Sequence, residues 1–197
     1  TFYHPHNMML FVVGNIQPEE LVDVIKENQN KKHFFPETSI QRKKIEEPES
    51  VAVKEQIDIM QVEMNKLIVS IKINDILTNP QEKIKRELSF NLLFDLYFSK
   101  SSVLYNEWLS KGYINETFSA NFTQERDYAF ILMGGDQDDY HLLQKTIFDF
   151  IEHIDDLVIE QEDFERIKRK TIGNFINSYN SPESIANSFS RYYFEGI

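Results

Sequence analysis

Asn79-Pro80-Gln81-Glu82 opens the stretch that decides the fold, which runs from Asn79 to Gly135. Asn79 suits the position before a helix, Pro80 suits the first helical position, and Glu82 can complete a capping box. Apolar residues then follow at helical spacing: Ile84, Leu88, Leu92, Leu93, Leu96 and Tyr97. A helix that is apolar on nearly every side must be covered on most of its surface. We therefore expect the core helix here, ending at Phe98.

The same stretch continues into a short helix and a β-hairpin. Ser101 or Ser102 can cap the short helix, and Gly112 can end it as a left-handed residue. Its apolar positions are Leu104, Trp108 and Leu109. Polar and apolar residues alternate over Ile114–Phe122, and Tyr128–Met133 is a second apolar run, so residues 123–127 are predicted to join two strands.

Further strands and helices are predicted on both sides of this stretch. Met9–Val13 reads as a buried strand, and a helix follows from Pro18. Val51–Ile59 and Leu67–Ile73 read as two more strands. Three helices are predicted after Gly135: one capped by the acidic loop 136–139, one from residues 160–163, and one capped by Ser181-Pro182-Glu183. The resulting order of elements predicts an α+β fold, a mostly antiparallel sheet covered by helices.

The domain organisation follows from length and polarity. The 197 residues are enough for one α+β domain over 1–197. Residues 30–50 lack periodicity and are predicted to be a polar linker between an N-terminal β-α unit and the main body. The basic clusters at residues 31–32 and 42–44 of this linker are interpreted as solvated, the alternative being contact with an acidic partner. Since the chain starts at Thr1 and stops at or just after a helix, we expect a fragment of a longer protein.

Composition excludes several classes of partner and site. The net charge of −11 argues against nucleic acid and anionic membranes as partners, and no apolar run reaches the ~20 residues of a membrane span. The chain has no cysteine, which excludes disulfides, thiolate metal sites and a cysteine nucleophile. The lack of cysteine also agrees with a reducing compartment, so we predict a cytoplasmic location.

Histidine offers two candidate metal sites. His4 and His6 could clamp a metal, but they have no carboxylate partner and are interpreted as structural. His33 and His141 stand alone and are interpreted as solvated.

The second candidate is the segment Asp149-Phe150-Ile151-Glu152-His153, which has the spacing of the inverted zincin motif H-x-x-E-H. Asp149 stands in place of the first histidine, and Phe150 and Ile151 fall on an apolar helix stripe. We interpret the segment as an exposed helix face.

The remaining motifs carry no chemistry. Gly134-Gly135-Asp136 lacks the context of a phosphate loop and is interpreted as a strand exit that needs positive φ. Glycosylation sequons begin at Asn115 and Asn121, but no secretory signal accompanies them. No catalytic or metal-binding residue is predicted, and no residue is assigned to substrate binding.

The order of several short motifs resembles the second domain of insulinase/pitrilysin-type zinc metallopeptidases, closest to a bacterial cytosolic branch related to processing peptidases. The resemblance covers nearly the whole chain except the linker. It is carried by Tyr3-His4-Pro5, Leu10-Phe11-Val12-Val13-Gly14-Asn15, Pro18-Glu19-Glu20-Leu21, Ser101-Ser102, Leu104-Tyr105, Lys111-Gly112-Tyr113-Ile114, Phe118-Ser119-Ala120, Asp163-Phe164-Glu165-Arg166, Gly173-Asn174-Phe175, Asn180-Ser181-Pro182-Glu183 and Arg191-Tyr192-Tyr193-Phe194.

The resemblance implies a metallopeptidase half-domain of the insulinase/mitochondrial processing peptidase type, one of two similar halves. It implies that the zinc motif and the zinc lie in the preceding domain of a parent zinc metalloendopeptidase, and that this fragment is inactive. The family holds substrate with an Arg/Tyr pair after the last helix. Because Arg191 and Tyr192 fall on that helix, they are not predicted to be this pair.

Three functions follow as hypotheses. The leading one is a non-catalytic second domain that walls a peptide chamber and helps to position peptide as an added β-strand. Its partners would be a peptide or small protein substrate and the homologous zinc-bearing domain, in the same chain or in a paired subunit. The net charge would favour basic peptides. The alternatives are a scaffold subunit from a zinc-lacking paralogue, and a small-molecule binding domain with an apolar pocket under the sheet.

Overall fold

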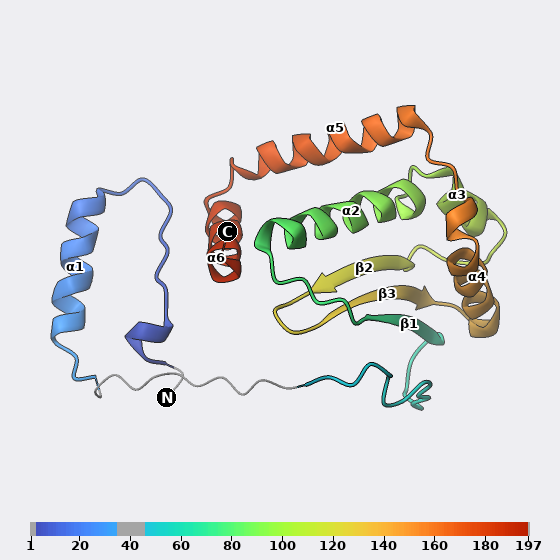
Figure 1. The fold of residues 1–197 in the computed structure, drawn as a ribbon. Helices are drawn as coiled ribbons and strands as arrows, with labels where there is room; N and C mark the ends of the chain where they lie inside the picture. The colour runs from blue at the N-terminus through green and yellow to red at the C-terminus, as the bar shows by residue number, and fades with distance from the viewer. Residues whose placement is uncertain (1–2, 35–45, 197) are drawn as a thin grey trace. The chain divides into compact units, whose positions relative to one another are not determined.

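The computed structural model describes residues 3–34 and 46–196, which form the helices and strands drawn in Figure 1. The helices are α1 (Pro18–Asn30), α2 (Pro80–Phe98), α3 (Val103–Ser110), α4 (Tyr140–Glu152), α5 (Gln161–Ser178) and α6 (Pro182–Glu195). The strands are β1 (Lys66–Ile73), β2 (Ser119–Gln124) and β3 (Ala129–Asp136), and short 3-10 turns cover Pro5–Asn7 and Ile154–Asp156. The predicted α+β class is confirmed.

Contacts group the chain into two compact units. One consists of Thr1–Glu46 and Asn174–Ile197, and the other of Glu47–Gly173. The second unit contains the sheet and α2, α3 and α4. Within the predicted linker 30–50, residues 35–45 lie outside the described part of the chain. A single domain over 1–197 stays a prediction.

Helices α2, α3, α4 and α6 begin at side-chain caps that were predicted from the sequence. Asn79 Oδ1 accepts a hydrogen bond from the Glu82 N–H at 3.1 Å, and Ser102 Oγ accepts one from the Tyr105 N–H at 3.1 Å. Asp139 caps α4 and Ser181 caps α6 in the same way. Each cap satisfies a backbone N–H that has no partner within its helix.

The described sheet is antiparallel with the order β1-β3-β2. Near the middle of the sheet, Leu132 of β3 lies opposite Ser70 of β1 on one side and Asn121 of β2 on the other. The predicted strand Ile114–Phe122 is wrong over its first half, since β2 begins at Ser119. The reason is local: Asn115 Oδ1 accepts hydrogen bonds from the N–H and the hydroxyl of Thr117, which holds the backbone in a turn.

Two other predicted strands are absent from the described sheet. Met9–Val13 and Val51–Ile59 form no strand pair, and the exposed fraction is 67% for Leu10 and 100% for Ile59. The prediction that Met9–Val13 is a buried strand is therefore wrong for this chain. An apolar segment becomes a strand only where it pairs with the backbone of a neighbour, and neither segment has such a pairing among the described residues.

The core lies between the sheet and α2, α3 and α4. Phe98 is its centre, with its ring 5.6 Å from Trp108, 5.4 Å from Phe118 and 4.9 Å from Phe150. Helix α2 is less completely covered than its sequence predicts, because Leu88 is 46% exposed while Phe94 and Phe98 are buried. The phenylalanine side of α2, and not the whole helix, faces the core.

The glycine pair of β3 serves close packing and not a turn. Gly134 and Gly135 lie inside β3 and have no positive φ, so the predicted strand exit is wrong. A Cβ on Gly135 would lie 2.9 Å from Phe118 Cα, and one on Gly134 would collide with the backbone oxygen of Leu67. Gly112, in contrast, has φ +71° after α3, which confirms its predicted left-handed role.

Candidate functional site

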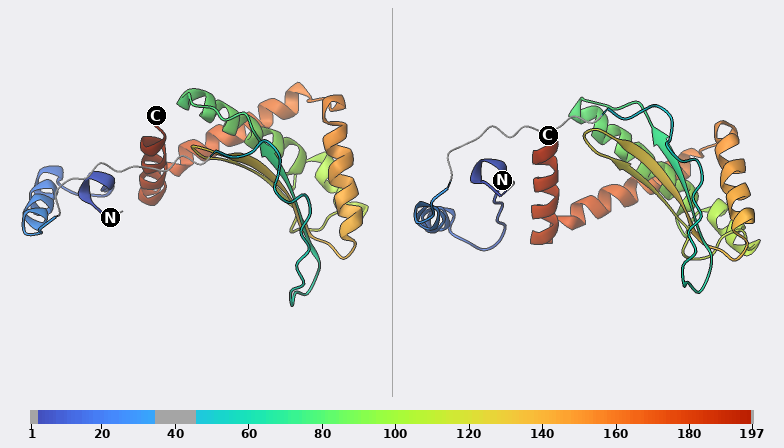
Figure 2. Two further views of the ribbon diagram at one scale, coloured as in Figure 1. Left: turned by 60° about the horizontal axis from the view of Figure 1, so that its bottom comes forward. Right: turned by 90° about the horizontal axis from the view of Figure 1, so that it is seen from below.

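One face of the β1-β3-β2 sheet is covered by helices. Val69, Ile71, Ile131 and Met133 point into the core cluster, which also holds side chains of α2, α3 and α4. Figures 1 and 2 show α2 running along this side of the sheet. The sheet therefore has its helical layer on one side.

The opposite face carries the alternate residues of the same strands, because successive side chains of a strand point to opposite sides. The cross-strand rows of this face are Ile68-Gly134-Ser119, Ser70-Leu132-Asn121 and Lys72-Phe130-Thr123. Ile68 is 60% exposed, and Ile68, Phe130 and Leu132 stand outside the core cluster. We call these three rows the open sheet face.

An aromatic pair extends the open sheet face at one end. The Tyr128 and Phe130 rings stack with centroids 5.9 Å apart and an interplanar angle of 9°, and Tyr128 is 48% exposed. Apolar side chains thus stand beside the hydroxyls and amides of Ser70, Asn121 and Thr123. This mixture suits an extended peptide, which offers apolar side chains and backbone hydrogen-bonding groups in alternation.

The charges beside this face are balanced by ion pairs. Lys66 Nζ lies 3.4 Å from Asp136 Oδ1, and Lys72 Nζ lies 3.2 Å from Glu47 Oε2 and 2.6 Å from the carbonyl oxygen of Pro48. The negative charge of the chain is not concentrated here. The geometry therefore lends no support to a preference for basic peptides at this face.

The edges of the sheet also offer binding groups. Strands β1 and β2 each have a strand neighbour on one side only among the described residues. An extended peptide can add to such an edge through backbone hydrogen bonds.

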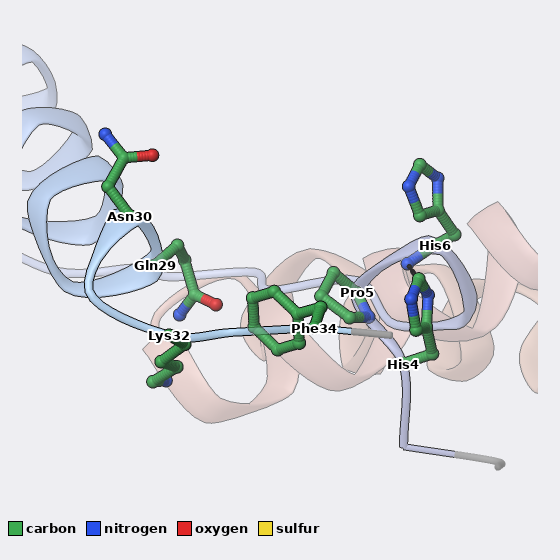
Figure 3. A pocket seen from close by; sticks show the side chains of 7 residues that line it. All are labelled: His4, Pro5, His6, Gln29, Asn30, Lys32 and Phe34. Carbon is green, nitrogen blue, oxygen red and sulfur yellow. Dashed lines mark hydrogen bonds between the residues drawn. The ribbon is translucent and has the colours of Figure 1, made fainter. Parts of the chain in front are cut away.

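The candidate histidine pair lies in a surface hollow, shown in Figure 3, that is lined by His4, Pro5, His6, Gln29, Asn30, Lys32 and Phe34. The His4 and His6 rings stack 5.1 Å apart, and His4 Nδ1 accepts a hydrogen bond from the His6 backbone N–H at 3.3 Å. This nitrogen serves as the cap of a 3-10 turn, and the described residues that line the hollow include no carboxylate. The structure thus shows a backbone role for His4.

The segment Asp149–His153 forms the C-terminal end of α4. Phe150 is buried in the core, whereas Asp149, Glu152 and His153 are exposed, as the sequence predicts for an outer helix face. His153 Nδ1 lies 2.8 Å from the Asp149 carbonyl oxygen. This hydrogen bond is the main cause of the raised pKa of His153. Desolvation opposes it by lowering the pKa, and the nearby carboxylates of Asp156, Glu152 and Asp149 add to the rise.

The remaining candidate residues lie apart from the open sheet face. His33 and His141 are exposed, and Asn115 belongs to the turn before β2. Arg191 and Tyr192 lie on α6 as expected, with Arg191 Nε 3.2 Å from Glu195 Oε1. Lys31 pairs with Glu27, while the cluster at residues 42–44 falls outside the described residues.

The described residues show neither a cluster of metal ligands nor a helix suited to a membrane. No group of three or more His, Cys, Asp or Glu side chains in residues 3–34 and 46–196 is arranged to hold a metal ion. None of the helices in those ranges has the length and apolarity to cross a bilayer.

Sequence reasoning assigned no substrate-binding residue, and the open sheet face was missed. A signal was available in Ala129–Met133, where both alternating sets of side chains are apolar. Such a run indicates a strand that is apolar on both faces. Among the described residues, helices cover only one of those faces.

Comparison with known proteins now defines the class. The family model described as the Peptidase M16 inactive domain matches residues 1–171, and the chain belongs to this family. The resemblance stated from the motifs is confirmed.

The relatives are about twice as long as this chain. It is 41% identical over 194 residues to the uncharacterized zinc protease YmfH of Bacillus subtilis (strain 168). The matched region covers 98% of this chain and 45% of YmfH. A crystal structure described as an M16-like peptidase from Alicyclobacillus acidocaldarius matches 92% of this chain and 43% of its own, with a TM-score of 0.78 at 25% identity. A protease from Helicobacter pylori shares the fold, with a TM-score of 0.72 at 20% identity over 93% of this chain and 44% of that one.

Proposed function

We propose that this chain is the non-catalytic half of a zinc metallopeptidase, and that it lends the open sheet face to the wall of a peptide chamber. The zinc, the general base and the scissile bond would lie in the homologous companion half. The family model supports the inactive role, and the relative described as a zinc protease supports a zinc-bearing parent. We also propose a cytoplasmic location, which agrees with the absence of cysteine.

The observation that carries the proposal is the face of the sheet that no described helix covers. A three-stranded sheet with apolar residues on both faces would ordinarily be covered on both. Ile68, Leu132 and Phe130 are left without a helical layer, beside polar groups that can bind a peptide backbone. A wall that contacts substrate transiently needs such a mixed surface, whereas a permanent interface would be more apolar.

A scaffold subunit is the second candidate, because the same face could meet an active partner protein. The sequence that precedes Thr1 in the parent gene distinguishes the two. An H-x-x-E-H motif there supports the enzyme, and its absence supports the scaffold.

Peptide binding to the full-length gene product tests the proposal directly. Ile68→Glu places a charge on the open sheet face without touching the core, and we expect the Kd for an extended fluorescent peptide to rise at least about tenfold, as for ~1.4 kcal/mol. Val103→Glu is the control, since Val103 is 81% exposed on α3, away from this face. Equal binding by both variants and the unmodified protein would refute the chamber wall.

A further inference from the structure

The apolar segment Met9–Val13 leads into helix α1 and has no strand partner among the described residues. No hydrogen bond joins the backbone of Met9–Val13 to any other described residue. Its exposure nevertheless alternates as in a strand, with Met9, Phe11 and Val13 half-buried and Leu10 and Val12 exposed.

Both faces of this segment are apolar. On one face Phe11 stacks on Phe189 of α6, with ring centroids 4.3 Å apart and an interplanar angle of 4°. On the other face Leu10 and Val12 line a surface groove together with Leu21 and Ile25 of α1. A strand with helical cover on both faces is typical of the interior of a sheet, where it has a strand on each side.

Helix α1 is likewise incompletely covered. It is amphipathic in sequence, yet none of its side chains is buried, and Val22 beside the groove is 44% exposed. A helix packed on a full sheet would bury its apolar stripe on several strands, whereas α1 meets a single extended segment. Neighbouring strands would account for both features, because they would pair with the backbone of Met9–Val13 and fill the groove beside α1.

We infer that Met9–Val13 is a β-strand of a sheet that belongs mainly to the companion half of the parent protein, with α1 covering that sheet. The inference rests on the proposed pairing with a companion half. In each relative, more than half of the length lies outside the matched region. Those proteins therefore contain further residues that could form the sheet. The partner required is the edge of a β-sheet with apolar side chains on the face toward α1.

Amide hydrogen exchange on the full-length gene product and on the 197-residue chain tests this. We expect the amides of Leu10–Val13 to exchange at least about a hundredfold more slowly in the full-length protein than in the chain alone. Amides of β3 should be protected in both samples, which shows that the sheet of this chain is folded in each. Equal exchange of Leu10–Val13 in the two samples would overturn the inference, whether both are fast or both are slow. Protection that appears only with added peptide would overturn it as well.

A pair of variants keeps the test decisive if the chain alone does not fold. Val12→Asp places a charge in the groove, whereas Val24→Asp changes a residue of α1 that is 62% exposed and does not line the groove. Val12→Asp should lower the Tm of the full-length protein by several degrees, and Val24→Asp should leave it unchanged. Equal Tm values for the two variants would overturn the inference. Neither readout involves zinc or peptide, so loss of the chamber-wall proposal and loss of this one are distinguishable.

Discussion

The side chain of Ser102 makes two hydrogen bonds, one to each of two consecutive helices. Its hydroxyl donates to the carbonyl oxygen of Tyr97 at 2.6 Å and accepts from the Tyr105 N–H at 3.1 Å, and the residue is 3% exposed. One side chain thus joins the end of α2 to the start of α3. The sequence predicted a cap at Ser101 or Ser102 but not the second bond, which depends on how the two helices meet.

Ser102→Ala should lower the free energy of unfolding by about 1–2 kcal/mol, because a cap is lost and a buried carbonyl loses its donor. Chemical denaturation measures the change. Ser101→Ala is the matched control, since Ser101 is exposed, and a change below about 0.5 kcal/mol is expected there. Equal effects at the two positions would contradict the double role of Ser102.

Replacing glycine by alanine should change the stability of the chain in opposite directions at positions 134 and 173. Gly134→Ala drives a Cβ into the backbone of β1 and should cost about 1–3 kcal/mol of stability. Gly173→Ala adds a methyl to an exposed position of α5 with nothing within 4 Å, and should stabilise the chain by about 0.5–1 kcal/mol. Thermal unfolding of the two variants checks the sign, and a stabilised Gly134→Ala would show that the strands are not packed this closely.

His153 should titrate above its ordinary pKa of 6.5, because its ring bonds to the Asp149 carbonyl oxygen and faces carboxylates. A raised pKa means that the folded state holds the proton more tightly than the unfolded state. The resulting stabilisation is fully present below pH 6.5 and is lost as pH rises through the folded pKa. NMR titration of the His153 ring in the native chain and in urea measures the difference. A native pKa equal to the value in urea would contradict the hydrogen bond.

Among the helices and strands, α2 shows where hydrophobic periodicity misleads. The leucines recur every fourth residue, but the phenylalanine side is the one that packs on the sheet. Leu88 stays exposed because the core offers partners to one side of the helix only. Periodicity therefore predicts that a helix is amphipathic, while its orientation depends on the shape of the opposing layer.

Phe98→Ala should cost about 3–5 kcal/mol, because it removes a ring from the centre of an aromatic cluster. Leu88→Ala on the same helix should cost less than about 1 kcal/mol, as expected for a partly exposed side chain. Urea denaturation compares the two variants. A larger loss at Leu88 would mean that the leucine side of α2 is the buried one.

Under the proposed function, the zinc and the base that hydrolyse a peptide bond would come from the companion half and not from this chain. We expect the 197-residue chain to leave a quenched fluorescent peptide intact with or without added zinc. The full-length gene product with zinc is the positive control. Zinc-dependent cleavage by the chain alone, removed by a chelator and restored by zinc, would place the active site in this half.

How much could be predicted from sequence depends on the range of the interactions involved. The caps at Asn79, Ser102, Asp139 and Ser181 were predictable because a cap involves residues only three positions apart. The family and the α+β class were predictable from the order of motifs and elements. The strands at Met9–Val13 and Val51–Ile59 were predicted but are unpaired here, because strand formation needs a partner that periodicity does not reveal.

The chain's local preferences thus settle where α1–α6 form, whereas for strands they predict β1–β3 together with two segments that stay unpaired among the described residues. The tertiary structure alone decided which face of the sheet is covered, which side of α2 is buried, and why Gly134 and Gly135 must lack side chains. These properties depend on contacts between residues far apart in the chain, and the sequence pattern within one element contains no record of which neighbour it will meet.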